Sequence, residues 1–241
     1  KEKMNGQPIR KSLYSVKPSY KIDNYKYFWV SNFKTHTYDK IKAKLLYIGP
    51  HSYVWVYNNQ ISQSDAAKLG QEFDSSIYSK IHDNFGKESD VNYDGKINIL
   101  VYDIQDGFSG YGGYVAGYFD PNDFYPGTHS NQSEIFYIDT YPLMGMWSTK
   151  DVTQAYDTLA HEFQHMVNFN ENVLVEKHGQ MDTWLDEGLA MAAEQIYKGQ
   201  ALDDRIDYYN HSDSIADGQS LLHWNDNNDT LANYFLSYLF V

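Results

Sequence analysis

The sequence predicts an α+β fold in which a β-rich N-terminal part is followed by a mostly helical chain. Three observations support this prediction. Short segments rich in aromatic and β-branched residues recur early in the chain, as in strands separated by turns. Apolar residues then recur every three or four positions in residues 64–85 and again in residues 151–168. This spacing places them on one face of a helix in each segment.

The predicted strands of the N-terminal part are residues 27–30, 43–48 and 53–57. Gly49-Pro50 marks the turn between the last two. We interpret the many aromatic side chains of these strands as packing residues rather than as a binding platform.

Residues 64–85 form the first predicted helix, with Ser64 as its N-cap and Gly86 at its end. Its apolar stripe indicates a helix that backs the sheet. Three further strands are expected after it, at residues 96–102, 111–119 and 134–140. The C-terminal part is expected to be helical at residues 182–197, 203–210 and 230–241, with a loop at 212–219.

Composition limits the classes of protein and partner. A length of 241 residues is enough for a buried core in one domain or two closely joined subdomains, and no apolar run is long enough for a membrane span. The net charge of −13 disfavours nucleic acid and anionic membranes as partners, because both would be repelled. The chain has no cysteine, which excludes disulfides, cysteine-ligated zinc and a thiol nucleophile.

The segment His161-Glu162-Phe163-Gln164-His165 lies inside the predicted helix 151–168. Two histidines four residues apart lie on the same helix face, where both imidazoles can bind one Zn²⁺. Glu162 would flank the metal and act as general base towards a water that the metal activates. Such a string can also arise by chance on a solvated helix face, so a second signal is required.

The second signal is Trp184-Leu185-Asp186-Glu187-Gly188-Leu189-Ala190, on the next predicted helix. A catalytic zinc takes three protein ligands and keeps one position open for water, so we expect Glu187 to be the third ligand. Without the upstream motif, Glu187 would be an ordinary surface charge on an amphipathic helix. Asp157 and Glu194 are expected to orient the ligating imidazoles through hydrogen bonds.

Residues 90–98 match the first nine positions of a calcium-binding loop. The expected Ca²⁺ ligands are Asp90, Asn92 and Asp94, followed by Gly95 at the sharp turn. The match is incomplete, because position twelve is Val101 instead of a bidentate Glu. The alternative interpretation is an acidic turn between a helix and a strand.

These motifs together resemble a known family of enzymes. The His161-Glu162-x-x-His165 segment followed by the Glu187 segment is similar to the gluzincin branch of zinc metallopeptidases. Residues 112–121 (GGYVAGYFDP) and 135–142 (IFYIDTYP) extend the similarity to the hyicolysin family of secreted bacterial neutral zinc metalloproteases. The resemblance covers most of the chain from about Ala66 and is most specific between Gly112 and Ala190.

The resemblance implies a zincin-like fold, in which a twisted mixed sheet with an antiparallel edge strand packs on the active-site helix. It implies a secreted, extracellular zinc endopeptidase that acts on proteins or peptides. Gly113, Tyr114 and Val115 are expected at the cleft rim, where an edge strand would pair with the substrate; the alternative is a bent corner of the sheet. Tyr234 is expected to stabilise the oxyanion, with Tyr238 as the second choice.

Neighbouring families differ at identifiable positions. Metzincins have Gly and His where this chain has Asn168 and Glu171, and thermolysin-like enzymes have Ser-Asp where it has Ala190-Met191. The chain also lacks the G-x-M-E-N segment of gluzincin aminopeptidases, which favours an endopeptidase. The alternatives are a zincin-fold binding protein without catalysis and a non-peptidase zinc hydrolase.

We therefore expect a β-rich segment at residues 1–62 and a catalytic domain at residues 63–241. Within that domain, residues 63–170 would form an upper subdomain with the sheet and active-site helix, and residues 171–241 a helical lower subdomain. The chain stops inside an apolar segment, so we expect the native protein to continue beyond Val241. We expect it to act as a monomer. No signal peptide is visible, because Lys1-Glu2-Lys3 leads into polar sequence, and a processed mature form or a trimmed chain would explain this equally well.

Overall fold

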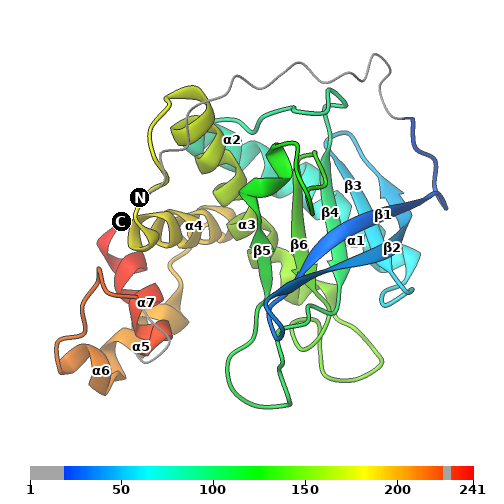
Figure 1. Cartoon of the computed structure of the whole chain (residues 1–241). Helices are drawn as coiled ribbons and strands as arrows, with labels where there is room; N and C mark the ends of the chain where they lie inside the picture. Colours follow the sequence, from blue (N-terminus) through cyan, green and yellow to red (C-terminus); the bar gives the residue numbers. More distant parts are fainter. Residues whose placement is uncertain (1–18, 225–228) are drawn as a thin grey trace.

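A computed structural model describes residues 19–224 and 229–241 and confirms the predicted α+β class (Figure 1). Six strands form one mixed sheet in the order β1-β2-β3-β4-β6-β5. The strands are β1 (Tyr25–Asn32), β2 (Thr37–Ile48), β3 (Ser52–Tyr57), β4 (Ile97–Tyr102), β5 (Gly117–Phe119) and β6 (Ile135–Asp139). The first part of the predicted N-terminal segment, including Lys1-Glu2-Lys3, lies outside the described residues.

Strands β1, β2 and β3 form an antiparallel meander, and β4 and β6 continue the sheet in parallel with β3. The short strand β5 pairs antiparallel with β6 at the end of the sheet. This is the antiparallel edge strand that the zincin-like fold predicts. Because β3 and β4 pair directly, the N-terminal strands share one sheet with the strands that follow.

The predicted helix 64–85 is one continuous helical segment consisting of α1 (Gln63–Glu72), a π-helical turn (Phe73–Ile77) and α2 (Tyr78–Phe85). The prediction of Ser64 as N-cap is wrong. Ser62 caps the helix instead, because its backbone is extended and its hydroxyl accepts a hydrogen bond from the Asp65 N–H at 3.1 Å. Gly86 ends the helix with a φ of 107°, as predicted.

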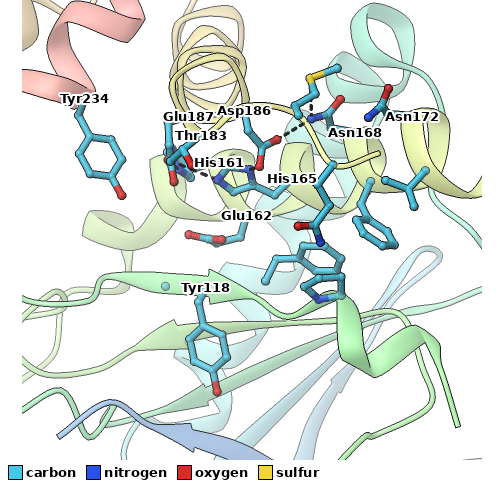
Figure 2. Close-up of a pocket in the computed structure, with 17 residues that line it drawn as sticks. Tyr118, His161, Glu162, His165, Asn168, Asn172, Thr183, Asp186, Glu187 and Tyr234 are labelled. Atoms are coloured by element: carbon cyan, nitrogen blue, oxygen red, sulfur yellow. Dashed lines mark hydrogen bonds and ion pairs between the residues drawn. The ribbon is translucent and has the colours of Figure 1, made fainter. Parts of the chain in front are cut away.

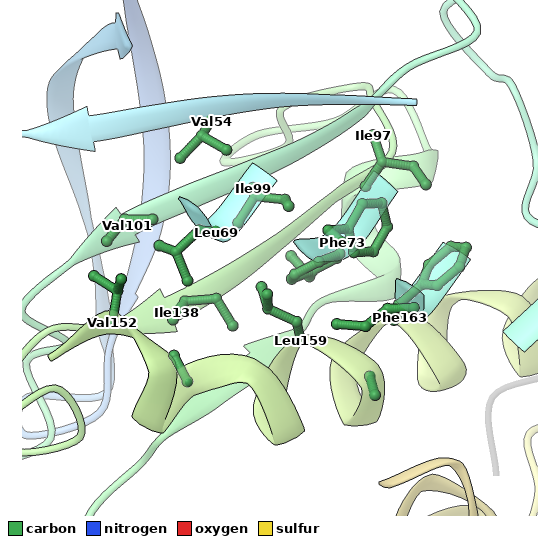
Figure 3. Close-up of a cluster of buried hydrophobic side chains, with 14 of the residues drawn as sticks. Val54, Leu69, Phe73, Ile97, Ile99, Val101, Ile138, Val152, Leu159 and Phe163 are labelled. Atoms are coloured by element: carbon green, nitrogen blue, oxygen red, sulfur yellow. The ribbon is translucent and has the colours of Figure 1, made fainter. Parts of the chain in front are cut away.

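The main core lies between the sheet and the helices α1, α2 and α3 (Tyr156–Phe169). Figure 3 shows Leu159 and Phe163 of α3 pointing towards the sheet, with Leu69 and Phe73 beside them. All four side chains are fully buried. A second core on the opposite face of the sheet contains Phe28, Trp55, Leu100 and Tyr137. Strand β4 is therefore buried on both faces, as its mostly apolar sequence indicates.

The prediction of a strand over residues 111–119 is wrong for most of its length, because only Gly117–Phe119 form β5. The preceding residues form a loop, in which the Asp106 carboxylate accepts a hydrogen bond from the Val115 N–H at 2.7 Å. Gly112 has a φ of 89°, a backbone conformation that does not occur in a regular strand. Gly113, Tyr114 and Val115 consequently lie in this loop and not in the edge strand.

The predicted helix 151–168 begins as a 3₁₀ turn (Val152–Ala155) capped by Asp151, continues as α3, and ends in a π-helical turn (Asn170–Val175). The remaining helices are α4 (Thr183–Lys198), α5 (Asp203–His211), α6 (Asp213–Ala216) and α7 (Thr230–Phe240). Helix α6 lies within the predicted loop 212–219, because Ser212 caps a single helical turn there. Within residues 19–224 and 229–241, no helix combines the length and apolar character that a membrane span requires.

Candidate active site

Helices α3 and α4 pack side by side and bring three predicted metal ligands together (Figure 2). The Nε2 atoms of His161 and His165 lie 3.2 Å and 3.5 Å from Oε2 of Glu187. Three donors on a tetrahedron with metal bonds of about 2.0–2.1 Å lie about 3.4 Å apart. Both distances are close to this value, and the three ligand atoms all lie within 4.8 Å of one another, so the three side chains can bind one metal ion.

The donor set also has suitable chemistry and burial. The side chains of His161, His165 and Glu187 are 15%, 12% and 17% exposed, so they open to the cleft but are mostly shielded from water. Two imidazoles and a carboxylate suit a divalent transition metal ion. Among the described residues, no other group of three His, Asp or Glu side chains converges in this way.

Glu194 orients His161. Its Oε1 lies 2.7 Å from Nδ1 of the imidazole, which leaves Nε2 directed towards Glu187. The Arg205 guanidinium donates to the other oxygen of Glu194 at 3.2 Å. The sequence predicts this role for Glu194, but the same prediction for Asp157 is wrong. Asp157 instead accepts a hydrogen bond from Lys198 at 2.7 Å, because its side chain extends towards the end of α4.

Asp186 has the corresponding position beside His165. Its Oδ2 lies 3.3 Å from Nδ1 of the imidazole, and its Oδ1 accepts a hydrogen bond from the Asn168 amide at 2.5 Å. Sequence reasoning missed this contact, although Asp186 directly precedes the predicted ligand Glu187 on α4. Each imidazole therefore has a carboxylate of α4 beside its Nδ1 atom, within hydrogen-bonding geometry for His161 and at a longer 3.3 Å for His165.

The carboxylates around the two histidines favour positively charged groups in the site. Burial lowers the pKa of His161, but Glu187 and Glu194 outweigh it and raise the pKa to about 10. Burial raises the pKa of Glu187, but the two imidazoles lower it by more, so this carboxylate stays ionised. The donors are thus arranged to hold a cation in a mostly buried position.

Glu162 lies between the two histidines and strand β5 (Figure 2). Its side chain is buried and lines the cleft, and no described residue forms an ion pair with it. The absence of a side chain at Gly117 of β5 leaves room for the Glu162 side chain at this position. A Cβ atom at residue 117 would lie 2.7 Å from Cγ2 of Thr158 and 3.0 Å from Cγ of Glu162. Sequence reasoning missed Gly117, whose signal was a glycine inside a predicted strand.

The two tyrosines proposed for α7 have different surroundings. Tyr234 lines the cleft beside Glu162 and Glu187, and burial together with these two carboxylates raises its pKa. The Tyr238 hydroxyl instead accepts a hydrogen bond from the Leu202 N–H at 2.9 Å and donates to Gln195. Tyr238 therefore joins α7 to α4 and does not reach the candidate site.

Two cavities meet at the candidate site, with volumes of about 400 Å³ and 440 Å³. The first extends along β5 towards Pro121, and the second extends towards the loop before β5. Tyr114 and Val115 line the second cavity, whereas Gly113 lines neither. The edge strand in the cleft is β5, and the predicted rim residues belong to the loop beside it.

The predicted calcium loop forms a tight turn before β4. The Gly95 N–H donates to Asp90 Oδ1 at 3.1 Å, the Asp94 N–H donates to Asn92 Oδ1 at 3.1 Å, and Gly95 has a φ of 67°. Asp90 and Asp94 are not part of a converging metal cluster in the described chain. The neighbouring Glu134 is fully buried, and its Oε2 has no hydrogen-bond partner among the described residues.

No protein-family model matches the chain. Over 222 residues, the chain is 49% identical to a protein described as neutral metalloprotease ShpI from Staphylococcus hyicus. The chain is a homologue of this metalloprotease. The resemblance to the hyicolysin family is thereby confirmed. The aligned region is 91% of the chain but only 51% of the relative, so the chain spans about half the length of that protein.

We expect Glu194→Ala to reduce the affinity of the metal-free protein for Zn²⁺ or Co²⁺ by about 10–100-fold, because His161 loses the contact that orients it. Asp157→Ala is the matched control on α3, since Asp157 contacts Lys198 and no histidine. Competition titration with a chelator of known affinity measures both variants. Equal affinities for the two variants would contradict the assigned role of Glu194.

Proposed function

We propose that the chain is a zinc-dependent endopeptidase that hydrolyses peptide bonds in proteins. The observation that carries this proposal is the convergence of His161, His165 and Glu187 beside Glu162, in a chain homologous to a neutral metalloprotease. A set of two histidines and one glutamate that leaves a fourth position for water is typical of catalytic zinc. Such a zinc ion supplies a Lewis acid that lowers the pKa of a water and polarises the substrate carbonyl.

Glu162 is the proposed general base. Its carboxylate flanks the three donors without belonging to them, so it is available to take a proton from the attacking water. The same group is placed to pass this proton to the leaving amine. Because Glu162 lies next to β5, a peptide bound along that strand would bring its scissile bond within reach.

Strand β5 is the proposed binding edge for the substrate main chain. Among the strands of residues 19–224 and 229–241 it is the last of the sheet and pairs on one edge, with β6. An extended peptide can therefore add to its free edge through backbone hydrogen bonds. Cavities extend from the site in both directions, which supports cleavage inside a chain and not only at its end.

We further propose that the cleft separates two subdomains, residues 63–170 and 171–241. The sheet, β5 and α3 lie on one side, and α4, α5 and α7 on the other (Figure 1). Proteins outside the cell are the proposed substrates, in keeping with the family resemblance. A secreted location is also compatible with the absence of cysteine, and we propose that the protein acts as a monomer.

Cleavage of casein tests the function directly. We expect the protein to cleave it, to lose this activity with a zinc chelator and to regain it with added Zn²⁺. A protein that binds zinc without cleaving casein would instead be a binding protein or a hydrolase of another substrate class.

Two substitutions separate the base from the ligands. Glu162→Gln should lower activity by at least about a hundredfold and leave zinc content nearly unchanged, because the side chain does not ligate. Glu187→Ala should lose zinc as well as activity, because it removes one of three protein ligands. Metal analysis beside the casein assay measures both effects. A Glu162→Gln protein that keeps most of its activity would refute the mechanism.

Tyr234 is the proposed hydrogen-bond donor to the oxyanion that forms on the substrate carbonyl. Tyr234→Phe should lower kcat by about 10²–10³-fold, the usual effect of removing one oxyanion donor. Tyr238→Phe, four residues further along α7, removes a hydroxyl that bonds Leu202 and Gln195, and should leave kcat nearly unchanged. Similar kcat values for Tyr234→Phe and the wild type would remove Tyr234 from the mechanism.

Calcium is proposed at the Asp90 loop, with Asp90, Asn92 and Asp94 as ligands. The turn geometry and the unpartnered oxygen of Glu134 nearby support this assignment. Burial raises the pKa of Glu134 to about 7, and a nearby cation would favour its ionised form. The loop leads into β4 and lies outside the cleft, so Ca²⁺ would stabilise the fold without taking part in the chemistry.

Ca²⁺ at a hundredfold excess over its Kd should stabilise the zinc-loaded protein by about 2.7 kcal/mol. For a chain of this size, this corresponds to a rise in Tm of roughly 5–11 °C. Asp90→Ala should abolish the rise, and replacement of the exposed Asp83 on α2 should not. Thermal melts of the three proteins with and without Ca²⁺ measure these shifts in Tm. Equal shifts in Asp90→Ala and the wild type would exclude the loop.

A further inference from the structure

Strands β1 and β2 form a hairpin at the end of the sheet that lies away from α4, α5 and α7 (Figure 1). Directly paired residues of two neighbouring strands have their side chains on the same face of the sheet. One face of this hairpin therefore combines aromatic rings with lysines. We call it the hairpin face, and it consists of the pairs Tyr25–Lys44, Tyr27–Lys42 and Trp29–Lys40.

The hairpin face is open to solvent. Tyr25 and Tyr27 are 56% and 59% exposed, although the opposite face of the same strand is buried in the second core through Phe28 and Val30. The interpretation of the N-terminal aromatic residues as packing residues is therefore confirmed for Phe28 and wrong for Tyr27. Large aromatic side chains that gather on an exposed surface are typical of an interaction site.

The lysines of the hairpin face lie between its rings. The ammonium group of Lys42 is 4.9 Å from the centre of the Tyr25 ring and 5.8 Å from that of Tyr27. The ammonium group of Lys40 is 5.6 Å from the centre of the Tyr27 ring and 5.0 Å from that of Trp29. Rings and positive charges thus alternate along the hairpin, and the cation–π contacts hold the long lysine side chains in place.

The positive charge of this face is available to a partner. Among its three lysines, only Lys44 forms an ion pair with a described residue, Asp23, at 2.7 Å. Asp39 directly precedes Lys40 in β2, so its side chain points to the other face of the hairpin. The whole chain has a net charge of −13, and the hairpin face departs from this acidic character. Such a local surface favours an anionic partner.

The row of rings is also fixed to the rest of the molecule. The Asn131 side chain accepts a hydrogen bond from the Trp29 N–H at 2.8 Å and donates one to the Trp29 carbonyl at 2.9 Å. The His129 ring packs edge-on against the Trp29 ring and stacks on the Tyr38 ring, each at 4.6 Å. A partner would therefore meet a preformed surface, which reduces the conformational entropy lost on binding.

We propose that the hairpin face binds a carboxylated polysaccharide. Lys40 and Lys42 are two residues apart on one strand, so their Cα atoms are separated by about 6.6–6.8 Å. They can contact successive carboxylates of an extended chain. Tyr25 and Tyr27 offer rigid, amphipathic rings against which sugar rings can pack. A linear polymer in which carboxylates and flat rings both repeat matches this alternation of lysines and aromatic side chains.

Other anionic polymers match the face less well. An acidic polypeptide carries its charges on flexible side chains, which lose conformational entropy on binding, and has no flat ring between them. The dense phosphates of nucleic acid would be repelled by the net charge of −13. The aromatic residues of the face line neither cavity of the cleft, so this inference does not depend on the proposed function.

Binding of the zinc-loaded protein to immobilised polygalacturonate tests the proposal. We expect saturable binding that weakens as ionic strength rises, because the charges involved are exposed. Neutral dextran, polyglutamate and single-stranded oligothymidylate should bind at least about tenfold more weakly. The absence of binding to polygalacturonate would refute the proposal. Equal binding of polyglutamate or oligothymidylate would refute the choice of a polysaccharide, and equal binding of dextran would refute the role of charge.

A double substitution tests the lysines. Lys40→Gln combined with Lys42→Gln should weaken binding to polygalacturonate by at least about tenfold, because two charge-assisted contacts are lost. Lys87→Gln combined with Lys177→Gln is the matched control, since both residues are exposed, lie outside the hairpin and change the net charge equally. Zinc content and Tm establish that both proteins are folded. Equal losses of affinity in the two proteins would contradict the proposed site.

Substitutions of Tyr27 test the rings separately from the charges. Tyr27→Ala should weaken binding by about fivefold or more, because the ring between the two lysines is lost. Tyr27→Phe keeps the ring and should retain most of the wild-type affinity. An unchanged affinity in Tyr27→Ala would show that the rings take no part, and would overturn the assignment of a polysaccharide.

Discussion

The packing of α4 against α3 is the contact on which the candidate site depends. The imidazole of His161 on α3 lies 2.7 Å from Glu194 and 3.2 Å from Glu187, and both carboxylates belong to α4. The donors on α3 come from one helical face, but the carboxylates that meet them come from α4, so neither helix forms the site alone.

The site also carries more negative than positive charge. Glu162, Asp186, Glu187 and Glu194 surround two histidines, and Arg205 is the cation that contacts this group. A divalent ion would balance these carboxylates and join α3 to α4 at the same time. Binding of the metal and stability of the fold are therefore expected to be coupled, as in other sites whose ligands come from separate elements.

Sequence reasoning was most successful where the chemistry is local. The four-residue spacing of His161 and His165 needs only a helix, and the apolar stripe of residues 64–85 defines its own buried face. The strands β3, β4 and β6 are mostly apolar and were also predicted. These features follow from residues close together in the chain.

Features that depend on distant contacts were not predictable in this way. The loop before β5 resembles a strand in composition, and only the hydrogen bond from Val115 to Asp106, nine residues earlier, shows how it is held. Tyr234 and Tyr238 are one helical turn apart on α7, but Tyr234 lines the cleft whereas the Tyr238 hydroxyl bonds Leu202 and Gln195. The contact of Asp186 with His165 likewise depends on the rotation of α4 about its own axis.

Gly117 has no side chain, and this allows β5 to lie close to α3. The carbonyl oxygen of Tyr137 and the side chains of Thr158 and Glu162 already occupy the space that a methyl group at residue 117 would need. Any other residue would act as a wedge and push β5 away from α3. The absence of a Cβ atom at residue 117 therefore allows β5 to lie this close to Thr158 and Glu162 of α3, and a side chain at this position would require β5 or its neighbours to shift.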